Sequence, residues 1–197
     1  MKYLLMCVAV LTMTACGGED KSPENEAPQP AAPLAKSQNS DAFNASFRQL
    51  LDHYFALKDA LVASKDTAAA AVNTSAMALV GSADSLRLLE LKADEALLST
   101  ARSYVQGMSA EAKGLVGEKE LEKKRRSFQM ISGQLYDLMR TVQYDREIVY
   151  HQYCPMAFND EGADWLSRSS DIRNPYFGSR MLTCGEVKDS LDFTRGK

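Results

Sequence analysis

The sequence has little histidine, tryptophan and cysteine, and it lacks the short motifs of the common enzyme classes. Its 197 residues include two histidines, one tryptophan and four cysteines. We find no G-x-S-x-G, no H-E-x-x-H, no phosphate-binding glycine loop and no C-x-x-C pair. His151 and Cys154 are the only candidates for a base and a nucleophile, and no orienting partner is visible. We therefore expect a binding protein rather than an enzyme.

The chain also lacks a basic surplus and a proline in its central part. The formal net charge of −3 gives no support to a nucleic-acid surface. No proline falls between Pro33 and Pro155, as a helical bundle requires. The charged run of residues 119–126 mixes both signs, so we expect it to form the solvated face of a helix.

The first residues have the pattern of a lipoprotein signal. Lys2 precedes an apolar stretch that is too short to span a bilayer, which needs about 20 apolar residues. That stretch runs into small residues before Cys16 and resembles a lipobox, with Met13 where leucine is usual. We expect removal of residues 1–15 and lipid on Cys16. Gly17 does not resemble an inner-membrane retention signal, so we expect an anchor in the outer membrane that faces the periplasm.

The part that follows divides into a spacer and one domain. Residues 16–40 contain the lipidated cysteine and a stretch rich in Pro, Ala, Glu and Ser, with almost no large apolar side chain. Such a stretch cannot offset the entropy of ordering, so we expect a flexible linker. Residues 41–197 are long enough for a single domain with its own core.

Apolar spacing in residues 41–145 predicts a mainly α fold, an antiparallel bundle of about four helices. Steps of three and four run from Phe43 to Leu61 and again from Phe128 to Val142. Ser40 is a suitable N-cap for the first helix. Short connections favour antiparallel neighbours.

The middle of the bundle has weaker boundary signals. We expect the second helix to end at Gly81 and the third to begin after Ser85. Gly107 interrupts that third pattern, and Ser109 is a candidate cap for a new start. Residues 148–153 then alternate as in a short strand, and the rest of the C-terminal tail is predicted to be rich in loops.

Two sulfur pairs in the tail carry the chemistry. Cys154 and Met156 are two residues apart and would share one side of an extended chain. Met181 and Cys184 are three apart and would share one face of a helical turn. Thiolate and thioether are ligands that copper(I) prefers, and His151 is a candidate to replace one sulfur.

The segment between these pairs favours a sharp turn. Pro175 suits the second position of a turn, and Gly178 permits a positive φ. Such a turn would fold Met181 and Cys184 back toward Cys154. In an exported domain the alternative is a disulfide between Cys154 and Cys184, worth roughly 3–4 kcal/mol, with the methionines as core filler.

Several of these motifs resemble the domain of unknown function 3347 family. They are YCPMA at 153–157, IRNPYFG at 172–178 and MLTCG at 181–185, together with the first-helix stretch at 53–62. The resemblance spans residues 43–192. That family includes small exported proteins and domains fused to periplasmic adaptor subunits of heavy-metal efflux pumps.

The resemblance implies a role in heavy-metal handling with efflux components as partners. On that basis we expect copper(I) at Cys154, Met156, Met181 and Cys184. The alternative that stays open is a disulfide-stapled interaction module that docks on an envelope protein without binding metal.

Overall fold

The computed structural model describes residues 39–64 and 69–194. The predicted signal peptide, the predicted lipidation site at Cys16 and nearly all of the predicted linker therefore lie outside the described residues. No helix in the described ranges is both long enough and apolar enough to cross a membrane.

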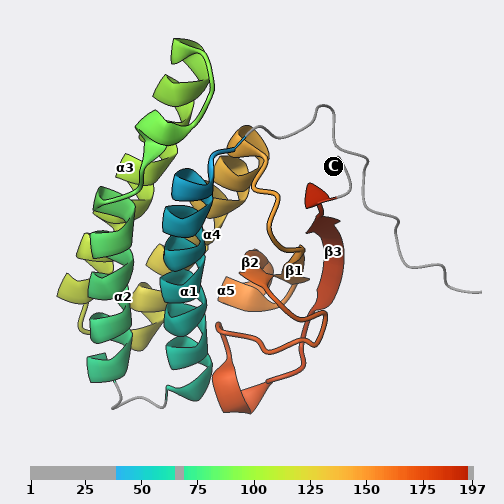
Figure 1. The fold of residues 1–197 in the computed structure, drawn as a ribbon. Helices are drawn as coiled ribbons and strands as arrows, with labels where there is room; N and C mark the ends of the chain where they lie inside the picture. Colours follow the sequence, from blue (N-terminus) through green and yellow to red (C-terminus); the bar gives the residue numbers. More distant parts are fainter. Residues whose placement is uncertain (1–38, 65–68, 195–197) are drawn as a thin grey trace, which may run out of the picture.

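Four long helices form an antiparallel bundle, as predicted (Figure 1). Neighbouring helices in the sequence pack against each other in turn, α1 on α2, α2 on α3 and α3 on α4. A short 3-10 turn, η1, joins α2 to α3. The bounds are α1 Asp41–Ala63, α2 Ala69–Asp84, η1 Leu88–Glu90, α3 Glu95–Gly117 and α4 Leu121–Val142.

The predicted stripes and caps account for these helices. The Ser40 hydroxyl accepts a hydrogen bond from the backbone N–H of Phe43 at 3.1 Å, which caps α1 as predicted. Asp94 caps α3 in the same way, through the N–H of Leu97 at 2.8 Å. Every member of the predicted seam of α4 is buried: Phe128, Ile131, Leu135, Leu138 and Val142.

The predicted boundaries in the middle of the bundle were wrong. α2 continues past Gly81, and α3 runs unbroken through Gly107 and Ser109. Neither glycine has a positive φ, and a single helical glycine costs only about 1 kcal/mol relative to alanine, which packing overrides. The third long helix does not begin directly after Ser85, since Leu89 lies in η1 with 84% of its surface exposed and α3 begins at Glu95.

The charged run at the start of α4 was also predicted incorrectly, because two of its members are buried. Lys124 is fully buried and donates to the side chain of Asn73 and to the carbonyl of Leu115, each at 2.8 Å. Arg125 is buried and donates to the carbonyl of Pro175 at 2.9 Å. Burial of a charge is tolerated when it is hydrogen-bonded. These side chains join α4 to α2, α3 and the tail.

The tail folds into a small antiparallel sheet instead of holding a single strand. Its strands are β1 Val149–Cys154, β2 Ala163–Ser167 and β3 Glu186–Leu191, in the order β2-β1-β3, and the short turn α5 Ala157–Asp160 lies between β1 and β2. Figure 1 shows this sheet beside α1 and α4, on the side away from α2 and α3. The sequence predicted β1 and missed β2 and β3.

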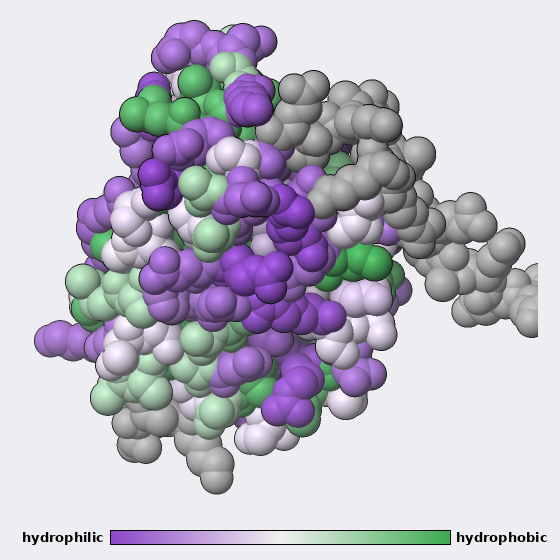
Figure 2. All heavy atoms as spheres, in the orientation of Figure 1, coloured by the Kyte–Doolittle hydropathy of each residue, from purple (hydrophilic) through white to green (hydrophobic). Residues whose placement is uncertain are grey.

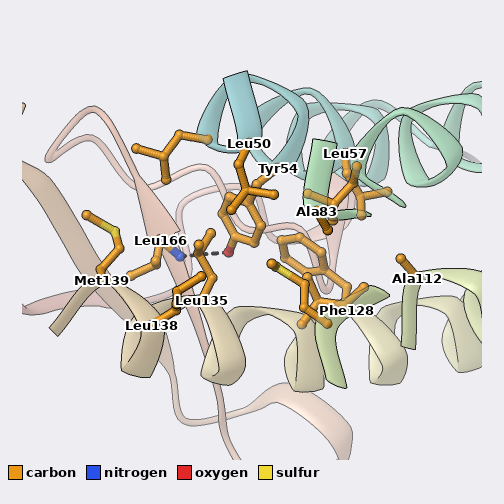
Figure 3. Packing of buried hydrophobic residues seen from close by; sticks show 14 of the residues in the cluster. Leu50, Tyr54, Leu57, Ala83, Ala112, Phe128, Leu135, Leu138, Met139 and Leu166 are labelled. Carbon is orange, nitrogen blue, oxygen red and sulfur yellow. Dashed lines mark hydrogen bonds between the residues drawn. The ribbon is translucent and has the colours of Figure 1, made fainter. Parts of the chain in front are cut away.

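Tyrosine hydroxyls from outside the sheet occupy the free edge of β2. The Tyr54 hydroxyl accepts from the backbone N–H of Leu166 at 3.0 Å and bonds to the Ser132 hydroxyl at 2.8 Å. The Tyr176 hydroxyl donates to the carbonyl of Asp164. Figure 3 shows Tyr54 reaching from α1 across the core to β2, with Phe128 nearby. These contacts attach the sheet to the bundle.

Replacing Tyr54 with phenylalanine should therefore lower the free energy of unfolding by about 1–3 kcal/mol, because the Leu166 N–H loses a buried acceptor. Urea denaturation measures this change. The control is Tyr104→Phe, since the Tyr104 hydroxyl makes no hydrogen bond within the described ranges. Equal losses in the two variants would contradict the role assigned to Tyr54.

The opposite edge of the sheet, β3, has features that hinder further strand pairing. Its register shifts between His151 and Gln152, which leaves Lys188 as an extra residue. The Lys188 ammonium lies 4.4 Å from the ring centre of Tyr153. A bulge and a lysine are common devices against edge-to-edge association. The molecular face in Figure 2 is largely hydrophilic, with apolar side chains near the end where α2 meets α3.

Candidate functional site

The structure brings the two cysteines of the tail together. Cys154 is the last residue of β1, and Cys184 lies in the turn before β3. Their sulfur atoms are 3.1 Å apart although the residues are 30 positions apart in the sequence. Both are free thiols, Cys154 fully buried and Cys184 half-buried. The predicted return of Cys184 toward Cys154 is confirmed.

A single buried asparagine organises the returning segment. The Asn174 amide donates to the carbonyl of Cys184 at 2.7 Å. Its side-chain oxygen accepts from the N–H groups of Tyr176 at 2.8 Å and Phe177 at 3.2 Å. Its backbone N–H donates to the carbonyl of Leu182 at 2.8 Å. Asn174 therefore holds both sides of the loop and fixes the backbone of Cys184.

Glycines allow the close approaches on either side of this loop. Gly178 has a φ of 56°, as the sequence predicted, and an added Cβ would lie 2.9 Å from the carbonyl oxygen of Val62 in α1. Gly185 has a φ of 140°, and an added Cβ would lie 2.7 Å from the carbonyl oxygen of Tyr153 and 2.9 Å from Trp165. Larger residues would push the loop away from α1 and from the sheet.

A buried glutamine fixes the start of the loop between β2 and β3, residues 168–185, which we call the covering loop. Gln152 lies two residues before Cys154 in β1, so both side chains are on the same face of the sheet. Its amide nitrogen donates to three successive carbonyls, those of residues 169, 170 and 171, at 2.9–3.3 Å. The loop therefore crosses the face of the sheet that carries Cys154.

The two methionines are near the thiols in the chain but differ in exposure. Met156 follows β1 in a turn with φ −87° and ψ −6°, so the predicted extended geometry for Cys154 and Met156 was wrong. Its side chain is 46% exposed. Met181 is half-buried, and its carbonyl accepts from the N–H of Cys184 at 3.1 Å, which closes the predicted tight turn.

The surroundings of Cys184 favour the protonated form of its thiol. The hydrogen bond between the two thiols, burial and the charge of a Cys154 thiolate raise the pKa of Cys184 to about 11. A metal ion that binds both sulfurs would therefore displace protons, and its affinity would increase with pH.

His151, the reserve ligand, lies on the other face of the sheet. It is three residues from Cys154 in the same strand, so the two side chains point to opposite sides. Its ring packs on Tyr136 of α4, with 4.4 Å between ring centres. Its Nε2 is 3.0 Å from Asp164 and its Nδ1 is 3.3 Å from Asp189. The structure does not bring His151 to the sulfurs.

The charge of His151 is set by the two carboxylates. Burial alone would lower its pKa, but the contacts with Asp164 and Asp189 outweigh burial and raise the pKa to about 9. Both ring nitrogens of the charged form carry protons, so neither is free to bind a metal. The contacts are ion pairs without well-aligned hydrogen bonds.

The donor set at the thiols suits a soft metal. Within residues 39–64 and 69–194, no group of three or more His, Cys, Asp and Glu side chains converges on a point that could hold a metal ion. Structural zinc sites take four ligands from those types, which the described residues do not supply. Two adjacent thiols, each with a methionine two or three residues away in the sequence, instead match the ligand types that copper(I) prefers.

Sequence reasoning missed the residue that supports the thiols and the two carboxylates that stabilise the charged form of His151. Asn174 was seen only as part of a turn motif, although Asn before Pro often makes such side-chain turns. Asp164 and Asp189 lie in β2 and β3, whose pairing with β1 was not predicted.

Residues 50–147 match the model of a protein family, DUF3347, whose description is "protein of unknown function". The match covers α1 from its first third through α4 and stops before β1, so it includes neither Cys154 nor Cys184. No curated protein and no solved structure matches the chain.

Proposed function

Because this chain belongs to the DUF3347 family through residues 50–147, and that family is one of unknown function, we propose a function from the chain's own geometry. The protein binds a soft metal ion, copper(I), at Cys154 and Cys184. Its role is binding rather than catalysis.

The observation that carries this proposal is the contact between the two sulfurs. The Cys154 and Cys184 side chains start from a strand end and a separate turn, yet their sulfurs are 3.1 Å apart. The carbonyl of Cys184 is held by Asn174, so the position of the second thiol is set by the fold. Prepositioned ligands bind a metal without an ordering cost at the moment of binding.

The two methionines would complete the sulfur environment in different ways. Met181 is half-buried beside Cys184, so its thioether is suited to a lasting bond. Met156 is exposed beside Cys154, so its thioether is suited to exchange with a donor or acceptor of the metal. His151 is not part of the set.

The cellular setting of this function is part of the proposal. The lipoprotein pattern at Cys16 supports a lipid anchor in the cell envelope, at the outer membrane and facing the periplasm. The resemblance of the tail to domains fused to efflux adaptors supports heavy-metal efflux components as partners. The formal net charge of −3 gives no support to a nucleic-acid partner.

An anaerobic copper(I) competition titration tests the proposal. The protein is the chain with Cys7→Ser and Cys16→Ser, so that Cys154 and Cys184 are its only thiols. We expect one copper(I) per chain, loss of binding in Cys154→Ser, and about tenfold weaker binding (~1.4 kcal/mol) in Met181→Leu. The affinity should rise with pH, because the pKa of Cys184 is raised to about 11.

Two controls make the result specific to the site. Met77→Leu removes an exposed thioether on α2 and should leave the affinity unchanged. His151→Gln should likewise bind copper(I) as the parent does. The only tryptophan, Trp165, packs against Gly185 beside Cys184, so its fluorescence is a second readout.

Absence of binding above the competing chelator, with both thiols confirmed as reduced, would exclude the copper site. The 3.1 Å contact of the sulfurs would then favour the second candidate, a disulfide-stapled module that docks on an envelope protein.

A further inference from the structure

We infer that the two thiols also form a reversible dithiol–disulfide couple that closes the proposed metal site, with Cys184 reacting first and Cys154 second. The inference rests on the proposed function and names how the same site is regulated. The oxidant is an external disulfide, either a small molecule or a protein.

The geometry leaves little movement for bond formation. The sulfurs are 3.1 Å apart, and a disulfide requires about 2.05 Å. The backbone on each side is already fixed, since Cys154 pairs with Ala163 in the sheet and Cys184 is held by Asn174. Rotation of the cysteine side chains is therefore enough, and the covering loop does not have to open.

The two thiols differ in access, which sets the order of reaction. Cys154 is fully buried at the end of β1, whereas Cys184 is half-buried in an exposed turn next to Thr183. An external disulfide can therefore reach only Cys184 without unfolding the sheet.

The exchange balances in two steps. The Cys184 thiolate attacks one sulfur of R–S–S–R, which forms a Cys184–S–R bond and releases the first RS⁻. The Cys154 thiolate then attacks the Cys184 sulfur, which forms the Cys154–Cys184 bond and releases the second RS⁻. The two thiol protons end on two molecules of RSH, and two electrons pass from the protein to the external disulfide. The oxidised site has no thiolate left for a metal.

Mass spectrometry with oxidised glutathione as the probe tests the order. In the chain with Cys7→Ser and Cys16→Ser, we expect an internal disulfide without a lasting adduct. Cys154→Ser should accumulate one glutathione on Cys184, and Cys184→Ser should react more slowly, on the order of tenfold or more. In urea the two single variants should react at similar rates, which shows that the fold causes the difference.

Two results would overturn the inference. Equal adduct rates in the folded single variants would contradict the proposal that Cys184 reacts before Cys154. A lasting mixed disulfide or a covalent dimer in the parent would contradict the proposal that the two thiols form an internal disulfide. Copper(I) titration of the reduced and oxidised forms separates this inference from the proposed function. Copper binding to both forms would refute only the proposal that the disulfide closes the metal site. An internal disulfide with no copper binding to the reduced form would refute only the metal site.

Discussion

Replacing Asn174 with alanine should lower the free energy of unfolding by about 2–4 kcal/mol, since one buried and two partly buried groups lose a partner, at roughly 1–3 kcal/mol for the buried group and less for the others. These groups are the carbonyl of Cys184 and the N–H groups of Tyr176 and Phe177. The side chain is fully buried, so water does not replace it without opening the loop. Chemical denaturation measures the loss.

Two further variants show which part of the amide matters. Asn174→Asp keeps the acceptor for Tyr176 and Phe177 but removes the donor to Cys184, so it should weaken copper binding more than Ser179→Ala does. Ser179 is exposed in η2 Gly178–Arg180 and serves as the control in the same segment. A free energy of unfolding for Asn174→Ala within about 0.5 kcal/mol of the Ser179→Ala value would contradict the role of Asn174 in holding the loop together.

The free energy of unfolding should fall by about 1–2 kcal/mol as the pH rises from 6.5 to above 9, through loss of the charge on His151, because solvent screening of the partly exposed carboxylates reduces the full value that the pKa shift implies. Its pKa rises from the ordinary value of 6.5 to about 9 on folding, and each unit corresponds to about 1.36 kcal/mol. A raised folded pKa means that the contribution is complete below 6.5 and disappears as the pH passes the folded pKa. The lowered pKa values of Asp164 and Asp189 express the same contacts and add nothing to this figure.

Denaturation at a series of pH values measures this dependence. His151→Gln should have a flatter profile between pH 6.5 and 9 and should lose most of its stability deficit at the alkaline end. The matched control is His53→Gln, which replaces the chain's other histidine and leaves both carboxylate contacts of His151 in place. Parallel profiles for the parent and His151→Gln would show that the two carboxylates do not hold a charged imidazole.

The parts of the fold that the sequence predicted are those governed by local periodicity. The seam from Phe128 to Val142 has apolar residues at steps of three and four, and all of them are buried in α4. The errors arose where tertiary contacts override local preference. Lys124 is buried because Asn73 and Leu115 supply its acceptors, and neither partner is near it in the sequence.

The missed strands have weak signals of their own. β3 reads EVKDSL, a mostly polar strand in which Lys188 is an extra residue at the bulge. β2 has only five residues, and its free edge is hydrogen-bonded to the hydroxyls of Tyr54 and Tyr176, which lie outside the sheet. Pairing with β1 stabilises both strands, and pairing between distant segments is not encoded in a local pattern.

Only the part of the site that depends on local sequence signals was predicted. The meeting of Cys154 and Cys184 followed from the turn residues Pro175 and Gly178, which are local signals. The position of His151 depended on a register that only the sheet defines, so its partners Asp164 and Asp189 were not foreseen.

The hydroxyl of Tyr54 and the N–H of Leu166 are joined although 112 positions separate them in the sequence. Contacts of such separation require a large loop to close and tend to form late in folding. We therefore expect the tail to dock after the helices have assembled. We expect the two cysteines to remain apart during early folding, so that the thiol pair is among the last features to appear and the first to separate when the tail detaches.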